Sequence, residues 1–437
     1  MKVLKFGGTS VGSADRMKEV AKLICDGERK IVVLSAMSGT TNTLVEISDY
    51  LYKKNSDAAN EIIYSLECKY RLHVEELYAT EEYKTKANAL LKEHFDYIRS
   101  FTKDLFTLFE EKVVLAQGEL ISTAMVNLYL NEIGVKSSLI PALEYMRTDK
   151  NGEPNSNYIK EHIKKQLDTI PVSEIYITQG FICRNAYGEI DNLQRGGSDY
   201  TASLIGAAID SDEIQIWTDI DGMHNNDPRF VEGTKPVRHL HFEEAAELAY
   251  FGAKILHPTC ILPAKLTNIP VRLLNTMEPD APGTLISNTT EKEKIKAVAA
   301  KDNITSIKIK SGRMLLAHGF LRKVFEIFES YQTSIDMITT SEVGVSVTID
   351  NKKHLSEIVD DLKKFGSVKV DEEMVIICVV GDLSWDNIGF ETKVMDAFGN
   401  IPVRMVSYGG SNYNISFLIK AEDKKKALQS LSATLFN

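Results

Sequence analysis

Lys5-Phe6-Gly7-Gly8-Thr9-Ser10 is the stretch that decides the fold. It follows the short apolar run Val3-Leu4 and precedes residues 14–24, where apolar side chains recur with helical spacing. Glycines at the start of a helix let backbone N–H groups approach an oxyanion closely, and the helix N-terminus favours the negative charge. The stretch therefore predicts a strand, a phosphate-binding turn and a helix.

The same turn differs from a P-loop in the position of its lysine. Gly7 and Gly12 have P-loop spacing, but Ser13-Ala14 occupy the place of the Lys-Ser/Thr pair. The lysine of this chain, Lys5, stands before the glycines. We therefore expect phosphate to be bound by a different construction.

Length and composition limit the classes of function. A chain of 437 residues should form two or three domains, and a net charge of -10 argues against a nucleic-acid partner. Five scattered cysteines without CxxC spacing indicate reduced thiols, with neither disulfides nor zinc. The N-terminal residues have no apolar leader, and the apolar runs are shorter than a membrane span. We expect a cytoplasmic protein with no membrane partner.

Residues 1–290 are predicted to form one α/β domain. Short apolar runs between amphipathic segments are typical of a mostly parallel sheet covered by helices on both faces. Residues 43–111 are charged and helical in pattern, which predicts a helical lobe. The expected strands are residues 31–36, 113–116, 138–140, 175–182, 214–220 and 271–275.

The rhythm changes after residue 290 to the βαββαβ pattern of small regulatory modules. The first copy has expected strands at 305–309, 334–338, 343–349 and 368–370 and helices near 321–328 and 355–365. The second copy has strands at 374–380, 403–407 and 415–419 and helices at 387–398 and 424–435. It is one strand short, so we expect residues 294–302 to complete residues 374–437, with the first module (residues 303–373) inserted. The alternative is that residues 295–300 form only a linker strand.

Further polar turns lie at predicted strand ends or helix starts. Residues 194–200 place Arg195, which can grip a carboxylate through two N–H bonds, beside Gly196-Gly197 and Ser198-Asp199. Ser198 or Asp199 could instead only cap the helix. Residues 35–42, 117–119, 217–229 and 252–258 supply further carboxylates, hydroxyls and a lysine. Such positioning and charge compensation is what phosphoryl transfer requires.

In order and spacing, these motifs resemble those of aspartate kinases. The resemblance rests on Lys5 to Ser10, Arg195 to Asp199, Thr218-Asp219 with Asp227-Pro228-Arg229, and Gly252 to Pro258, and the tail resembles tandem ACT domains. It implies the amino-acid-kinase fold followed by two ferredoxin-like ACT domains. It also implies ATP-dependent phosphorylation of L-aspartate to 4-phospho-L-aspartate, the first step of lysine, threonine and methionine biosynthesis.

The resemblance also implies roles for individual residues. Lys5 would neutralise the transferring phosphate and Asp199 would orient Lys5, while Mg²⁺ would bridge the ATP phosphates without a certain protein ligand. The substrate-binding residues would be Thr41, Glu119, Arg195 and Ser198. The nucleotide-binding residues would be Lys5, Gly7, Gly8, Ser10, Thr218, Asp219, His224, Arg229 and Lys254.

Two positions depart from the usual family pattern. Leu120 stands where the family often has an arginine after the glutamate, so only the role of that arginine is in doubt. His224 stands where an aromatic residue, commonly tyrosine, is frequent. An imidazole can still stack on adenine.

The regulatory half resembles the lysine-sensitive type through residues 336–343. The acids Asp336 and Glu342 could pair with a ligand ammonium, and the helix start at residues 318–321 could bind its carboxylate. The alternatives are acids that merely face solvent, and threonine as the effector. The expected lysine-binding residues are Met314, Gly319, Phe320, Leu321, Ile335, Asp336, Thr340, Ser341, Glu342 and Val343. Because such modules bind ligands between paired units, a homodimer or larger homo-oligomer through the ACT domains is expected.

Two rival functions remain open from the residues alone. One is a kinase of the same fold that acts on glutamate, N-acetylglutamate, carbamate or UMP. The other is a catalytically inactive amino-acid sensor, against which Lys5 and Asp199 argue.

Overall fold

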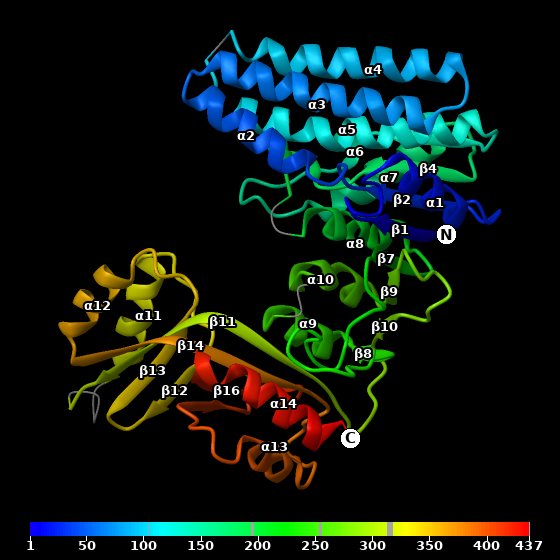
Figure 1. Ribbon diagram of the computed structural model, residues 1–437. Helices are drawn as coiled ribbons and strands as arrows, with labels where there is room; N and C mark the ends of the chain where they lie inside the picture. The colour runs from blue at the N-terminus through cyan, green and yellow to red at the C-terminus, as the bar shows by residue number, and fades with distance from the viewer. Residues whose placement is uncertain (104, 194–195, 253–255, 313–317, 437) are drawn as a thin grey trace. The chain divides into compact units, whose positions relative to one another are not determined.

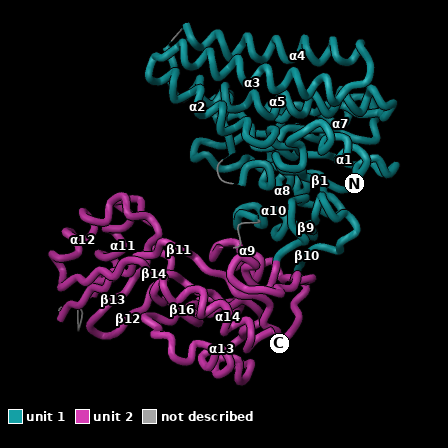
Figure 2. The backbone as a smooth tube through the Cα atoms, viewed as in Figure 1, with its two compact units in different colours: residues 1–223, 255–288 teal, residues 224–254, 289–437 magenta. Residues whose placement is uncertain are grey.

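The computed structural model describes residues 1–103, 105–193, 196–252, 256–312 and 318–436 (Figure 1). The chain divides into two compact units (Figure 2). Unit 1 comprises residues 1–223 and 255–288, and unit 2 comprises residues 224–254 and 289–437. Each unit is described by itself.

Unit 1 is built on a sheet in which β3, β4, β2, β1, β7, β9 and β10 are hydrogen-bonded in this order. All neighbours are parallel except β9 and β10, which are antiparallel. A separate antiparallel pair joins β5 and β6. The strands of unit 1 are β1 (Lys2–Phe6), β2 (Lys30–Leu34), β3 (Ser137–Ile140), β4 (Ile175–Gln179), β5 (Ile182–Arg184), β6 (Ile190–Asn192), β7 (Ile214–Thr218), β9 (Val271–Asn275) and β10 (Thr284–Ser287).

The central strands are buried on both faces, as the apolar runs predict. Every residue of β2 and β4 is buried, which is typical of parallel strands covered by helices. Lys5 lies near the end of β1, in register with Val33 of β2 and Ile216 of β7. The predicted mostly parallel α/β sheet is confirmed, and the carboxyl ends of β1, β2 and β7 meet at one edge, where open α/β sheets bind ligands.

Helices cover the sheet and also form the predicted lobe, in which α3, α4 and α5 run side by side (Figure 1). Charged faces alternate with buried apolar stripes in these helices, and Tyr70 and Phe95 form an edge-to-face pair in their shared core. The helices of unit 1 are α1 (Ala14–Ile24), α2 (Thr40–Tyr52), α3 (Ser56–Leu77), α4 (Glu81–Ser100), α5 (Leu108–Glu132), α6 (Ala142–Tyr145), α7 (Ser156–Thr169), α8 (Gly197–Ile209) and α10 (Pro258–Thr267).

The expected strand at residues 113–116 is wrong, because these residues lie inside helix α5. This helix is buried on most sides, so its sequence lacks the polar stripe that marks a helix at the surface. Among the described helices, α5 alone is long and apolar enough to cross a membrane, but 67% of its most apolar window is buried inside the protein. That burial is typical of a core helix. The polar residues 117–119 therefore lie on a helix and not in a turn after a strand.

Unit 2 contains a six-stranded antiparallel sheet in the order β12, β13, β11, β14, β16 and β15. Its two longest strands, β11 and β14, pair with each other along their lengths. The strands of unit 2 are β8 (His239–His241), β11 (Ile295–Lys310), β12 (Ile338–Ser341), β13 (Gly344–Ile349), β14 (Ser367–Gly381), β15 (Met405–Ser407) and β16 (Asn414–Lys420). The helices are α9 (Phe242–Tyr250), α11 (Phe320–Ser330), α12 (Leu355–Lys363), α13 (Phe390–Phe398), α14 (Lys424–Leu435) and the 3-10 helix η1 (Ala421–Asp423).

The expected elements of this half are mostly confirmed, with two corrections. The strand expected at residues 334–338 begins only at Ile338. The pairs of short strands expected at 295–300 with 305–309, and at 368–370 with 374–380, are each one long strand. Asn303 and Glu373 have left-handed backbones at the joints, and a local irregularity of this kind bends a strand without ending it.

Candidate active site and effector site

Lys5 and Asp199 form an ion pair in unit 1. The Nζ of Lys5 lies 2.7 Å from Oδ1 of Asp199, and only 12% and 14% of the two side chains are exposed. Lys5 is carried by β1, and Asp199 lies in the first turn of α8, where the helix dipole favours a carboxylate. The two residues predicted to act in catalysis are thus adjacent, although 194 positions separate them in the sequence.

Two glycines after Lys5 keep the strand end open. A Cβ on Gly7 would lie 3.4 Å from the Lys5 ammonium, and a Cβ on Gly8 would lie 2.8 Å from the carbonyl oxygen of Ala36. The second distance is shorter than real Cβ atoms show, so only glycine fits at position 8. Ser10 is buried, and its hydroxyl lies 2.9 Å from that of Thr276. A close backbone turn therefore lies beside the Lys5 ammonium, at the place where the sequence predicts a phosphate cradle.

A cavity of about 320 Å³ lies beside this turn in unit 1. Its size suits a small ligand. The lining includes three of the four predicted substrate-binding residues, which are Thr41, Glu119 and Ser198. Ser198 does not act as the N-cap of α8, which is Gly196; its hydroxyl accepts a hydrogen bond from Ser35 at 3.0 Å.

Glu119 is a buried carboxylate on this cavity. Its side chain comes from the middle of α5, and Gly118 lets the helix approach so closely that an added Cβ would lie 2.8 Å from that of Ala36. The N–H of Ala36 donates to Oε1 at 3.2 Å. The other oxygen, Oε2, is buried without a partner in the part of the chain that the structure describes. Burial raises the pKa of Glu119 to about 7.

The predicted nucleotide-binding residues fall in both units. In unit 1, Thr218 ends β7, and its hydroxyl contacts the carbonyl and the N–H of Ile220 in the turn that follows. Its carbonyl accepts a hydrogen bond from the N–H of Thr276, which follows β9. In unit 2, the guanidinium of Arg229 binds Asp227 through Nε and Nη2, at 3.0 and 2.6 Å. His224 Nδ1 lies 2.9 Å from the hydroxyl of Thr234.

The predicted effector residues gather in unit 2 around α11 and β12. Gly319 has φ +83° as the N-cap of α11, a conformation that glycine adopts without strain. Phe320 and Ile335 pack on the local core, while Leu321 is partly exposed. Thr340 and Ser341 end β12, and Glu342 and Val343 form the exposed turn before β13.

Asp336 differs from the other predicted effector residues because its side chain is only 1% exposed. It does not face solvent. Oδ1 accepts hydrogen bonds from Tyr250 at 2.8 Å and from Lys301 at 2.5 Å. Oδ2 is buried and, among the residues placed by the structure, makes no hydrogen bond. Burial raises the pKa of this carboxyl group, against the opposing effect of Lys301.

Three predicted site residues, Arg195, Lys254 and Met314, lie outside the described residues. Within the described ranges, no group of three or more His, Cys, Asp or Glu is arranged to hold a metal ion. His257 is the N-cap of α10.

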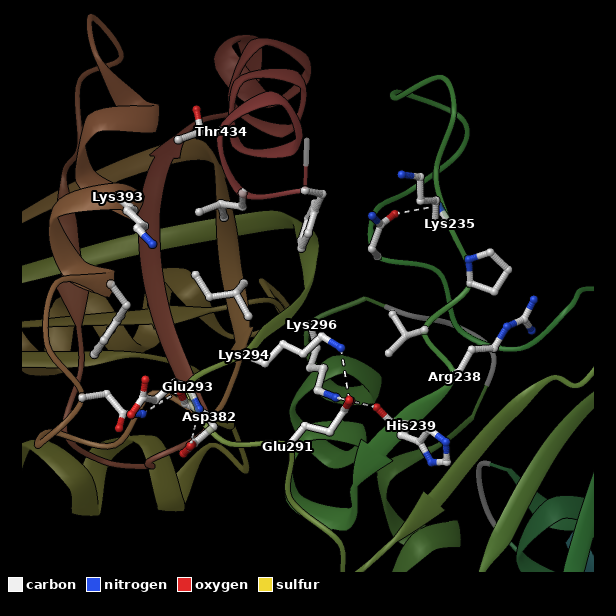
Figure 3. A pocket seen from close by; sticks show the side chains of 18 of the residues that line it. Lys235, Arg238, His239, Glu291, Glu293, Lys294, Lys296, Asp382, Lys393 and Thr434 are labelled. Carbon is white, nitrogen blue, oxygen red and sulfur yellow. Dashed lines mark hydrogen bonds and ion pairs between the residues drawn. The ribbon is translucent and has the colours of Figure 1, made fainter.

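A larger cavity, of about 790 Å³, lies within unit 2 (Figure 3). It contains none of the predicted catalytic or substrate-binding residues. Its buried cation is already neutralised, since Lys296 binds Glu291 and the carbonyl oxygen of His239. Lys294 binds the same carboxylate at 3.1 Å. Size alone therefore does not identify the active site.

Sequence reasoning missed Tyr250 and Lys301. Tyr250 is the last residue of α9 and Lys301 lies within β11, so neither belongs to a motif or to a glycine-rich turn. Their approach to Asp336 depends on tertiary packing. From the sequence one could infer only that Asp336, if it were buried, would need a cationic or hydroxyl partner.

Models of known families match two parts of this chain. The model described as "Amino acid kinase family" matches residues 1–275, and an ACT domain model matches residues 377–435. The first match covers more than half of the chain, and it spans both Lys5 and Asp199.

Individual relatives match the full length. The chain is 35% identical over 463 residues to aspartokinase 3, chloroplastic, of Arabidopsis thaliana, covering 99% of this chain and 81% of the relative. It is 33% identical over 451 residues to lysine-sensitive aspartokinase 3 of Escherichia coli strain K12, covering 99% of both.

Solved structures agree with these matches. Aspartokinase III of E. coli in complex with aspartate and ADP (R-state) is 32% identical, covers 100% of both chains and has a TM-score of 0.82. The complex of that protein with lysine and aspartate (T-state) has a TM-score of 0.78. The expected fold of an amino-acid-kinase domain followed by ACT domains is confirmed.

Proposed function

Because this chain belongs to the amino acid kinase family and, within it, to the aspartokinases, we propose how its own residues catalyse and regulate the phosphorylation of aspartate. The observation that carries the proposal is the Lys5–Asp199 ion pair, together with a cavity lined by Glu119, whose Oε2 is buried without a described partner. A cation at the phosphate end and an anion at the substrate end match a reaction between ATP and an amino acid.

The chemistry requires charge compensation more than proton transfer. The side-chain carboxylate of L-aspartate is already ionised, so it attacks the γ-phosphorus without a general base. The bond to the bridging oxygen breaks, ADP leaves, and 4-phospho-L-aspartate forms. Lys5 neutralises charge on the transferring phosphoryl group, and Asp199 keeps its ammonium at the strand end. Gly7, Gly8 and Ser10 line the phosphate turn.

Substrate selection follows from the cavity. Of the residues that line it, Glu119 binds the α-ammonium of aspartate, and Thr41 and Ser198 position the substrate. Arg195 is assigned the α-carboxylate from its sequence motif alone. Thr218, Asp219, His224, Arg229 and Lys254 serve the nucleotide. Mg²⁺ bound with ATP would supply charge neutralisation on the phosphates, and we assign it no protein ligand.

We further propose inhibition by L-lysine at the effector residues around Asp336. The lysine-bound E. coli neighbour and the lysine-sensitive relative support this. The pathway role at the head of lysine, threonine and methionine biosynthesis follows from the reaction. The free cysteines fit a reducing compartment, so we place the protein in the cytoplasm.

We also propose a domain division of residues 1–290, 303–373, and 294–302 with 374–437. Its support is the pairing of residues 295–301 of β11 with 376–381 of β14, beside β16 and α14. The ACT domains would join a homodimer or higher homo-oligomer, which a mass measurement in solution tests directly.

The deciding experiment measures ADP release with aspartate, glutamate, N-acetylglutamate, carbamate or UMP as acceptor, with and without lysine or threonine. We expect turnover with aspartate and inhibition by lysine. Lys5→Met should lower kcat by about 10²–10³-fold. Lys2→Met is the matched control, since Lys2 lies on the same strand but binds the exposed Glu28. Release of ADP without an aspartate requirement would contradict the assignment, and a normal Lys5→Met rate would contradict the mechanism.

A further inference from the structure

Asp336 is held by two groups from outside the stretch of sequence that predicts the effector site. Tyr250 and Lys301 both donate to Oδ1, while Oδ2 is buried with no hydrogen bond from any described residue. A buried carboxylate oxygen without a donor is destabilising. An ammonium group placed at Oδ2 would remove that cost.

The charged groups around Asp336 also carry a net negative charge that one cation would neutralise. Lys301 contacts Asp336 and lies 3.0 Å from Asp350, so one ammonium serves two carboxylates. The net charge of these three groups is therefore negative by one unit. Tyr250 adds a donor without adding charge, and its ring lies 4.4 Å from the Lys301 ammonium. One incoming ammonium group would neutralise the cluster.

Tyr250 ends helix α9, which is not part of the ACT modules. Two other side chains of this region contact the second module. Glu247 of α9 accepts a hydrogen bond from Asn414, and His241, the N-cap of α9, stacks on Tyr413 with ring centroids 5.0 Å apart. The hydroxyl of Tyr250 binds the first module through Asp336. Residues 253–255 begin three positions after Tyr250, and they include the predicted nucleotide-binding Lys254.

We propose that Tyr250 is a positioning residue of the effector site. Tyr250 holds Oδ1 of Asp336 so that Oδ2 accepts the side-chain ammonium of the effector, and it couples binding of the effector to helix α9. This deepens the proposed inhibition by lysine and rests on it. A bound ammonium favours the ionised carboxylate, and an ionised acceptor strengthens the hydrogen bond from Tyr250. Coupling between two equilibria is reciprocal, so Tyr250 strengthens effector binding and the effector strengthens the hold on α9.

The test compares Tyr250→Phe with Tyr331→Phe in the full-length protein. Tyr331 is the matched control, because its hydroxyl also binds an ACT-domain carboxylate, Asp361, at 2.9 Å. We expect Tyr250→Phe to raise the Kd for lysine, measured by calorimetry, and the lysine concentration for half-inhibition by about 5–10-fold. Tyr331→Phe should change both values by less than about twofold.

A double-mutant cycle separates positioning from a general loss of structure. In an Asp336→Asn background, Tyr250→Phe should have no further effect on lysine binding, because the hydroxyl acts through that carboxylate. Equal effects in both backgrounds would overturn the inference. An unchanged lysine Kd in Tyr250→Phe, with a wild type that lysine does inhibit, overturns this inference alone. A wild type that neither binds lysine nor responds to it overturns the proposed lysine inhibition as well.

Discussion

Glu119 of unit 1 and Asp336 of unit 2 share one arrangement of their carboxylate oxygens. Each is a buried carboxylate with one oxygen held by the protein and the other without a partner among the described residues. They differ in what holds the first oxygen. Glu119 has a neutral N–H from Ala36, whereas Asp336 has the ammonium of Lys301 as well as the hydroxyl of Tyr250.

Because of this difference, we expect the two carboxylates to differ in how strongly they bind an ammonium group and in how that binding depends on pH. Nothing charged among the described neighbours compensates Glu119, and its pKa rises to about 7. Its attraction for an ammonium ligand is therefore strong when it is ionised but sensitive to pH near neutrality. Asp336 already has part of its charge neutralised. We expect it to bind its ligand less strongly and with a weaker pH dependence.

The largest effect is expected for Glu119→Gln. The variant keeps the shape but removes the charge, so kcat/KM for aspartate should fall by about 100-fold, mainly through KM. Steady-state kinetics at saturating ATP would measure this. Glu132→Gln is a control on the same helix, since Glu132 is partly exposed and accepts hydrogen bonds from the backbone N–H groups of Ala79 and Thr80. A KM for aspartate that does not change would exclude Glu119 from the ammonium site.

Asp336→Asn should have a smaller effect, because Lys301 already shares the charge. We expect the lysine concentration for half-inhibition to rise by about 10- to 30-fold, with each curve normalised to its own uninhibited rate. Asp350→Asn tests whether Lys301 divides its charge between Asp336 and Asp350, because without the Asp350 carboxylate Lys301 pairs with Asp336 alone. Inhibition curves that coincide for the wild type and Asp336→Asn would show that the effector binds elsewhere.

The pH dependence of aspartate binding should distinguish the two carboxylates. With a pKa of about 7, Glu119 is mostly ionised at pH 8 and mostly protonated at pH 6. The KM for aspartate should therefore rise by about tenfold as pH falls from 8 to 6. Glu119→Gln should abolish this dependence. A wild-type KM that stays level over this range would contradict the raised pKa of the free enzyme.

The smallest expected effect is on stability. A carboxyl group whose pKa is raised on folding binds its proton more tightly in the folded state, so its contribution to stability is greatest below its unfolded pKa of about 4.5 and is lost as pH rises through about 7. Glu119→Gln should thus stabilise the protein at pH 8 by about 1–3 kcal/mol, and by almost nothing at pH 4.5. Thermal unfolding at the two pH values would measure a Tm increase of a few degrees at pH 8 only. An equal shift at both values would indicate a packing effect.

The sequence predicts those features that local patterns encode. The turn after Lys5, the small-residue helix after Gly196 and the helix at residues 424–435 are visible from glycine placement and apolar spacing, and the structure has all three. The proximity of Lys5 and Asp199 is different. It follows from the family resemblance, because no spacing rule links residues so far apart.

What could not be predicted depends on burial and on packing between distant segments. Helix α5 is misread as a strand at residues 113–116 because a helix buried on most sides has no polar stripe. A strand is expected from residue 334 because residues 334–338 are apolar enough to resemble one, but β12 begins only at Ile338. In the structure, Asp336 instead contacts Tyr250 and Lys301. Such a contact leaves no periodic trace in a sequence.

The continuous strands β11 and β14 have a consequence for dissecting this protein into fragments. Residues 295–301 and 304–310 belong to one strand that pairs along the whole of β14. A fragment beginning at residue 303 would retain the first ACT module and residues 374–437 of the second, but it would lose residues 295–301, the strand partner of residues 376–381. That exposed ladder would be available to pair with another chain. A soluble regulatory fragment should therefore begin before Ile295, and cleavage near Asn303 should release an aggregating piece and not an independent domain.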